Sequence, residues 1–291
     1  MVEHGNGLRP RLWLRRLLAL AGAAVLVVVV AVLAFGLGSA SKHAAPATTA
    51  ALPPPKPFKI VFPEGFTRAQ MAHRVAVVAK IAASEHRGKP HLSATGYLAA
   101  TAPRVIPGFG PKKRPLEGFL FPALYDFVAR TTSRQLVAAQ LAAFERNWRT
   151  LDLTYARSKK LTPYDVLIIA SMIEREAQVP SERKLIAAVI YNRLRLHMPL
   201  GIDATIRYGL HVPPTRALTQ SELASDNPYN TRKFLGLPPT PIANPGFAAM
   251  EAAAHPAQVD YLYFVRKPDH RHHYFTASYQ DFVDHEKAYG Y

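Results

Sequence analysis

The longest apolar stretch of the chain is 17–37, LLALAGAAVLVVVVAVLAFGL, which carries no charge. A helix that rises about 1.5 Å per residue would span about 30 Å over this stretch, the thickness of a bilayer core. Several arginines within 1–16 precede it, so the positive-inside tendency predicts a cytoplasmic N-terminus. A cleaved signal peptide is the alternative, but its apolar region usually runs only about 7–15 residues. We therefore predict a transmembrane helix.

The next segment, 38–57, is rich in Ala, Pro and Thr and ends in LPPPKP, which predicts a semi-rigid linker. The alternating FKIVF then predicts a short strand at 58–62, and PEG a turn. Thr67 is the predicted N-cap of a helix, because apolar residues follow it at helical spacing as far as Ile81.

Later periodic patterns predict a mixture of helices with few strands. The segment LEGFLFPALYDFV is dense in aromatic residues around a Glu-Gly turn. A polar, His-rich turn separates two short apolar runs near the C-terminus, which predicts a hairpin. Helices are predicted at 94–100, 132–151, 162–177, 180–195 and 279–289, and the hairpin at 261–265 and 273–275. The predicted fold class is α+β.

Two glutamates, Glu174 and Glu176, lie two residues apart on one predicted helix, so they point about 200° apart and cannot form a close pair. Glu176 shares a helical stripe with Ile169, Met172 and Ile173. A carboxyl bordered by apolar side chains has a raised pKa, as a general acid near neutral pH requires. The alternative is a carboxylate at a helix end that reaches solvent.

Polar residues in the predicted loops are further candidates. Asp203, Tyr229, Asn230 and Asn244 lie in Pro- and Gly-rich loops, and Asn192 lies late in a helix beside Arg193. Rigid loops of this kind suit a hydroxyl-rich ligand, although ordinary turn chemistry explains them equally well. A histidine cluster at 270–273 lacks an ordered ligand spacing, so no metal site is predicted.

Composition narrows the possible partners. The chain has 36 Lys+Arg against 20 Asp+Glu, a formal charge of +16, which favours nucleic acid, anionic lipid or an anionic wall polymer. No zinc-finger spacing, Walker loop or aromatic-basic RNA-binding signature is present, so nucleic acid is not a predicted partner. The absence of cysteine excludes a disulfide framework, a thiol nucleophile and Cys-based metal sites.

Six motifs in order carry a family resemblance. They are LEGFLFPALYDF (116–127), ASMIEREAQVPSERKLIAAVIYNRLRLHMPLGIDATIRYGL (170–210), DNPYNTRKFLGLPPTPIANPG (226–246), AAAHP (252–256), YLYFV (261–265) and HYFTAS (273–278). Together they resemble the endolytic murein transglycosylase family, also called YceG-like. The resemblance implies a single-pass anchor, a small LysM-like module at 58–104 and a mixed α+β catalytic domain at 105–291.

The resemblance also implies a function. The family's catalytic glutamate is the second one of an E-[KR]-E pattern, which is Glu176 here. The implied enzyme is a lyase of the bacterial inner membrane that needs no cofactor and cuts the β-1,4 bond between MurNAc and GlcNAc. It would act within nascent strands beside the glycan polymerases, leaving 1,6-anhydroMurNAc ends and terminating elongation. The family often has Asp-Pro-Thr where this chain has Asp203-Ala204-Thr205.

Supporting roles and rival functions remain open. Glu117 is the best candidate for a supporting carboxylate, and the five loop and helix residues above are candidates for substrate binding or for orienting Glu176. One rival function is a non-catalytic wall-binding scaffold. The other is a hydrolytic muramidase, which would normally need a second carboxylate about 5 Å or about 6.5–9.5 Å away. The sequence offers no convincing second acid.

Overall fold

The structure, a computed structural model, describes residues 57–85 and 89–291. The predicted cytoplasmic segment 1–16, the transmembrane helix at 17–37 and all of the linker except residue 57 lie outside these residues. Within the described part of the chain, no helix combines the length and the hydropathy that crossing a bilayer requires.

An antiparallel strand pair joins two distant parts of the sequence. The predicted strand is β1 (Phe58–Val61), and it pairs with β2 (Leu124–Phe127) so that Phe58 lies opposite Phe127. Their rings stack with centroids 5.2 Å apart. Strand β1 belongs to the predicted LysM-like module and β2 to the predicted catalytic domain, so the pair joins the two sides of the boundary expected at residue 104. The boundary and the module both stay predictions.

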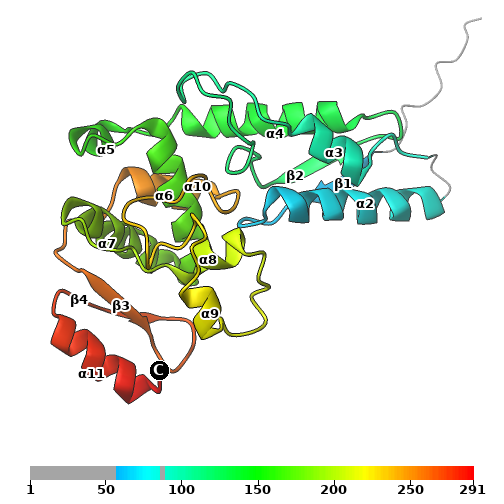
Figure 1. Cartoon of the computed structure of the whole chain (residues 1–291). Coiled ribbons are helices and arrows are strands. Elements are labelled where there is room, and N and C mark those ends of the chain that lie inside the picture. The colour runs from blue at the N-terminus through cyan, green and yellow to red at the C-terminus, as the bar shows by residue number, and fades with distance from the viewer. Residues whose placement is uncertain (1–56, 86–88) are drawn as a thin grey trace, which may run out of the picture. The chain divides into compact units, whose positions relative to one another are not determined.

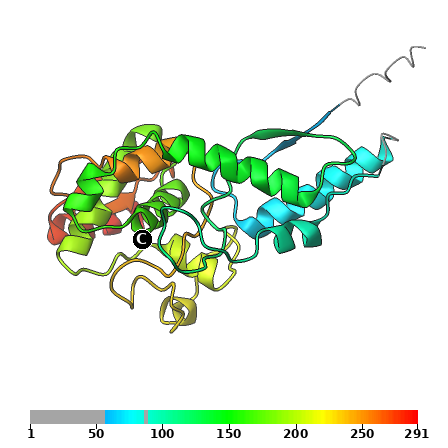
Figure 2. The same ribbon diagram turned by 90° about the horizontal axis from the view of Figure 1, so that it is seen from above.

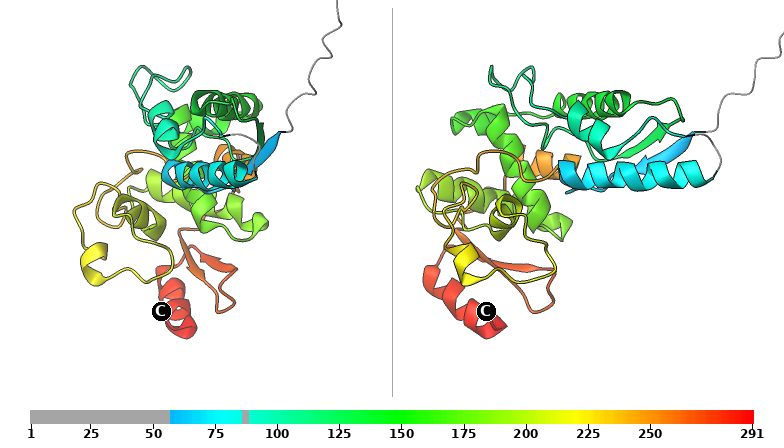
Figure 3. Two further views of the ribbon diagram at one scale, coloured as in Figure 1. Left: turned by 90° about the vertical axis from the view of Figure 1, so that its right-hand side faces the viewer. Right: turned by 45° about the vertical axis from the view of Figure 1, so that its right-hand side comes forward.

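Three helices pack together on one side of this strand pair, as Figures 1 and 3 show: α2 (Arg68–Ser84), α3 (Ala94–Ala100) and α4 (Ser133–Trp148). Thr67 caps α2 and also forms a capping box with Gln70, which fixes where the helix begins. The Tyr97 hydroxyl of α3 donates a 2.6 Å hydrogen bond to Gln140 of α4 inside the core. All three helices had been predicted, with ends that differ by at most a few residues.

The core of the second half is built on α6 (Pro163–Glu176), whose residues from Val166 to Ile173 are all buried. It packs against α7 (Arg183–Arg195), which follows a 3-10 turn (Pro180–Glu182), and against α10 (Phe247–Ala254). Helix α4 also contacts α10, as Figure 2 shows from above. The short α5 (Thr154–Ser158) and α10 were not predicted.

The C-terminal part is a hairpin covered by one helix. Strands β3 (Tyr263–Arg266) and β4 (His273–Thr276) pair antiparallel, and α11 (Tyr279–Tyr289) packs on both. Two short helices, α8 (Asp203–Gly209) and α9 (Gln220–Leu223), interrupt the preceding loops. The predicted hairpin, closing helix and mixed α+β class are confirmed. Asp203 begins α8, whereas the sequence had suggested a loop.

Candidate functional site

A pocket of about 860 Å³ opens beside the C-terminal end of α6, and we call it the Glu176 pocket. Its wall is formed by the ends of α6 and α7, the start of α8, the β3–β4 hairpin and α11, which meet on one side of the core in Figure 1. The charged side chains in its wall are Arg175, Glu176, Arg193, Asp203, Arg207, Arg232, Arg266 and Glu286. Five guanidinium groups against three carboxyl groups make the pocket basic.

Glu176 is the last residue of α6, and its carboxyl group lies at the edge of the core. Burial raises the pKa of this carboxyl, and the charge of Asp203 adds to the rise. The guanidinium of Arg266 and a hydrogen bond from the Ala204 backbone N–H lower the pKa of Glu176 by smaller amounts. The raised pKa agrees with the prediction from the apolar stripe, whose members are fully buried.

Asp203 brings a second carboxyl group into the same pocket. It is the first residue of α8, and its Oδ1 accepts a 2.7 Å hydrogen bond from the guanidinium of Arg232. It acts on Glu176 through its charge. The sequence could not reveal this arrangement, because the two carboxyl groups come from different helices joined by a long segment.

Glu117 lies elsewhere, in a buried hydrogen-bond network outside the wall of the Glu176 pocket. Its Oε1 accepts from the Asn244 amide at 2.8 Å and from the Arg68 backbone N–H at 2.9 Å. Its Oε2 accepts from the Tyr208 hydroxyl at 3.1 Å. Burial raises the pKa of Glu117 to about 7, although each of these donors lowers it. Gly118 completes the predicted turn with φ of +88°.

Asn244 extends this network. Its Oδ1 accepts from the Leu120 backbone N–H at 2.9 Å, and its amide also donates to the Phe66 carbonyl at 2.9 Å. Both Glu117 and Asn244 therefore hold together segments that are far apart in the sequence, and the structure places neither of them in the Glu176 pocket.

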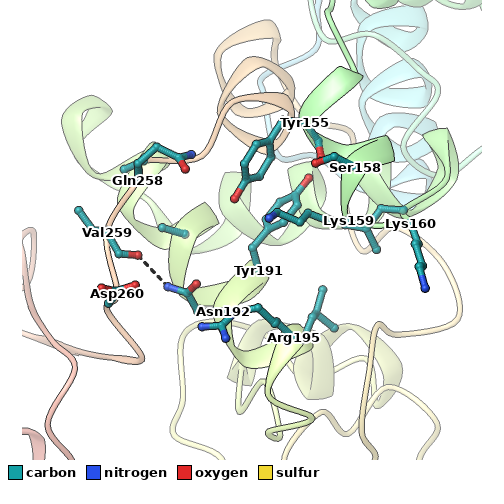
Figure 4. A pocket seen from close by; sticks show the side chains of 14 residues that line it. Tyr155, Ser158, Lys159, Lys160, Tyr191, Asn192, Arg195, Gln258, Val259 and Asp260 are labelled. Atoms are coloured by element: carbon teal, nitrogen blue, oxygen red, sulfur yellow. Dashed lines mark hydrogen bonds between the residues drawn. The ribbon is translucent and has the colours of Figure 1, made fainter.

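Asn192 lines a second pocket of about 840 Å³, shown in Figure 4, between α5, α7 and the segment 257–260. Its amide donates to the backbone carbonyls of Val259, at 2.8 Å, and Tyr261, at 3.0 Å. Tyr155 and Tyr191 face each other in this pocket with centroids 5.5 Å apart. The structure does not bring Asn192 together with Glu176.

Tyr229 and Asn230 stabilise the loops that precede α10. The Tyr229 hydroxyl shares a 2.7 Å hydrogen bond with Thr240. The Asn230 amide is buried and donates to the carbonyls of Leu223, at 2.9 Å, and Ser225, at 2.8 Å. Neither residue lines the Glu176 pocket. Of the seven candidates from the sequence, the structure brings together Glu176 and Asp203 alone in this pocket.

Most of the arginines of the pocket, and its histidine, were not singled out from the sequence. Arg266 and His273 come from the two strands of the hairpin, and Arg193 comes from the end of α7. Arg193 and His273 lie within the ordered motifs, and Arg266 directly follows one of them. Within residues 57–85 and 89–291, no three His, Asp or Glu side chains gather closely enough to hold a metal ion.

Comparisons with known proteins show the family. The model of the YceG-like family matches 39–288. The chain is 41% identical over 155 residues to the endolytic murein transglycosylase of Bacillus subtilis (strain 168), covering 53% of this chain and 43% of that protein. It is 33% identical over 228 residues to the endolytic murein transglycosylase of Streptococcus pneumoniae R6, covering 71% and 40%. The chain thus spans less than half the length of these relatives.

The fold has a solved counterpart. The crystal structure of a yceG-like protein from Listeria monocytogenes matches with a TM-score of 0.63 and 31% identity. The match covers 78% of this chain and 75% of that one.

Proposed function

The chain belongs to the YceG-like family, and on that basis we propose that it is a peptidoglycan lytic transglycosylase, a lyase. Its substrate would be the β-1,4 bond between MurNAc and GlcNAc within nascent strands, and its product a 1,6-anhydroMurNAc end. The observation that carries this proposal is the half-buried glutamate at the end of α6, Glu176, whose pKa is raised by burial in a basic pocket.

One carboxyl group can serve both steps of this reaction. Protonated Glu176 gives its proton to the glycosidic oxygen while the bond from that oxygen to C1 of MurNAc breaks. The resulting carboxylate takes the proton of the MurNAc C6 hydroxyl, whose oxygen forms the new bond to C1. Burial favours the acid of the first step, and the Arg266 charge and the Ala204 N–H favour the carboxylate of the second.

The charge of the pocket suits this substrate. Peptidoglycan carries stem peptides with free carboxylates, and five arginines face the cavity. Guanidinium groups bind carboxylates through paired hydrogen bonds. A strand could therefore lie with its sugars at Glu176 and its peptide carboxylates on the surrounding arginines.

The test is the chemistry of the products. Purified glycan strands are digested with the full chain, and the ends formed are identified by mass spectrometry. An anhydro end lacks one water relative to a reducing end. Anhydro ends support the lyase, reducing ends would replace it with a hydrolytic muramidase, and intact strands would favour a wall-binding scaffold.

A hydrolytic muramidase is the second candidate, because Asp203 shares the pocket. In hydrolysis Asp203 would activate water or attack C1, so Asp203→Asn should then slow cleavage by about 10²-fold or more. In the lyase reaction the C6 hydroxyl is the nucleophile, so we expect Asp203→Asn to keep more than about a tenth of the rate. Its remaining effect would come from the pKa of Glu176, which falls when a neighbouring negative charge is removed.

The cellular setting belongs to the same proposal. A membrane helix at 17–37 and the linker 38–57 would hold the enzyme on the outer side of the bacterial inner membrane, with 1–16 in the cytoplasm. From there, 58–104 and 105–291 could reach strands leaving the glycan polymerases of the elongation machinery and end their growth. Protease digestion of intact spheroplasts tests the orientation, because only an outward catalytic part would be cut.

A further inference from the structure

A buried carboxylate binds a histidine of the Glu176 pocket through both of its oxygens, one at the ring and one at the backbone N–H. His273 begins β4, and Glu182 ends the 3-10 turn before α7. The His273 Nδ1 lies 2.8 Å from Glu182 Oε2, and the His273 backbone N–H donates to Oε1 at 2.9 Å. The side chains are only 2% and 8% exposed, so water competes little for these contacts.

The contact fixes which ring nitrogen carries the proton. A carboxylate accepts hydrogen bonds, so Nδ1 must be the donor, and in the neutral ring Nε2 is then an acceptor. Phe264 and Phe275 contact the imidazole edge-on, with ring centroids 5.3 Å and 6.1 Å from it, and restrict its rotation. No residue of the described part of the chain bonds to Nε2, and His273 belongs to the wall of the pocket.

We propose that Glu182 orients His273 so that its Nε2 accepts a hydrogen bond from a sugar hydroxyl or acetamido N–H of a glycan in the Glu176 pocket. The inference rests on the proposed function for the identity of the ligand. The arginines of the wall offer donors alone, and they select the acidic groups of a strand. The Nε2 of His273 is a fixed acceptor among these arginines, so it selects a hydrogen-bond donor of the ligand. Every sugar unit carries such a donor, as a hydroxyl or an acetamido N–H. His273 thus contacts the substrate, and Glu182 is its positioning residue.

The competing explanation is a purely structural ion pair that fastens the hairpin to α7. His273→Asn separates the two, because the asparagine amide nitrogen replaces Nδ1 and can still donate to Glu182, while the atom at the place of Nε2 is lost. Glu182→Gln changes the tautomer instead. Its carbonyl can accept from the His273 backbone N–H and its amide can donate to Nδ1, so Nε2 becomes a donor.

The experiment measures binding and turnover separately. Peptide-free oligosaccharides of alternating GlcNAc and MurNAc are titrated by calorimetry into the full chain carrying Glu176→Gln, which prevents turnover. We expect His273→Asn to raise Kd by about tenfold, the loss of one hydrogen bond. Glu182→Gln should raise Kd by the same factor where the partner of Nε2 is an acetamido N–H, and by less where it is a hydroxyl, which can also accept. In chains with Glu176 intact, KM should rise similarly, with a smaller change in kcat, while Tm stays within a few degrees.

The neighbouring pair His272–Asp269 is a matched control. Its Nδ1 also lies 2.8 Å from a carboxylate oxygen, but both side chains are 48% exposed and His272 is not part of the pocket wall. His272→Asn should leave Kd unchanged. An unchanged Kd in His273→Asn would overturn the inference, as would losses of binding that follow a large fall in Tm. A third outcome is that the wild type binds the oligosaccharide but does not cut it, while His273→Asn still weakens binding. That outcome would refute the proposed function and leave the inference standing.

Discussion

Glycan cleavage should fall by about 10³- to 10⁴-fold when Glu176 is replaced by glutamine. The amide has the shape of the carboxyl group but can neither give a proton to the glycosidic oxygen nor take one from the C6 hydroxyl. Ile169, Met172 and Ile173 on the same stripe stay buried, so the fold should persist. The measurement is the initial rate of release of soluble fragments from purified strands, with Tm recorded for each variant.

Glu174→Gln is the matched control, two residues earlier on the same helix. Burial raises the pKa of Glu174 to about 7 as well, but its carboxylate accepts from the Gly246 backbone N–H at 3.0 Å and does not line the Glu176 pocket. A glutamine carbonyl can accept the same bond, so activity should remain near that of the wild type. Full activity in Glu176→Gln would refute the assignment of the catalytic acid.

Folding stability should fall by about 3–5 kcal/mol when Glu117 is replaced by leucine. The variant removes the acceptor of three hydrogen bonds, which come from the Arg68 backbone N–H, one hydrogen of the Asn244 amide and the Tyr208 hydroxyl. Each donor costs about 1–3 kcal/mol when unsatisfied, and leucine recovers part of this through apolar burial. Urea unfolding followed by circular dichroism measures the change. Glu145→Leu, at an exposed pair with Arg149, should change stability little.

The same carboxyl should give the wild type an unusual pH dependence. Glu117 titrates at about 7 in the folded protein and at its ordinary 4.5 in the unfolded chain, so the folded state binds more protons between these values. The contribution of Glu117 to the free energy of unfolding is therefore fully present below about pH 4.5 and is lost as the pH rises through 7. The loss amounts to about 3 kcal/mol. Glu117→Gln should remove this part of the slope. An equal slope in both proteins would contradict the raised pKa.

Local signals made much of the fold predictable. Thr67, Thr132 and Thr162 each accept a hydrogen bond from the first turn of a helix, so the starts of three helices can be read from residues that lie close together in sequence. Helices α8 and α10 escaped prediction because they are short and follow Pro- or Gly-rich loops. Strand β2 escaped because its partner lies more than sixty residues earlier, at Phe58–Val61.

The residues of the candidate site also differ in how far the sequence could predict them. The position of Glu176 followed from a helical period, which depends on neighbours within seven residues. The surroundings of Asp203 and His273 depend on contacts between separate elements, which no local pattern encodes. Glu117 had the burial expected of a functional carboxyl, but its partners are 49 to 127 residues away, and they place it in the interior.

The pairing of β1 with β2 bears on how the protein can be divided by proteolysis or truncation. A chain that began at residue 105 would lack β1, and the backbone of β2 would become an unpaired edge. The ring of Phe127, which is 2% exposed in the intact protein, would lose its cover on the side of Phe58. Bare apolar edges of this kind recruit strands from other molecules. The segment 105–291 alone should therefore self-associate. The segments 58–104 and 105–291 share one apolar interior, which neither can bury without the other.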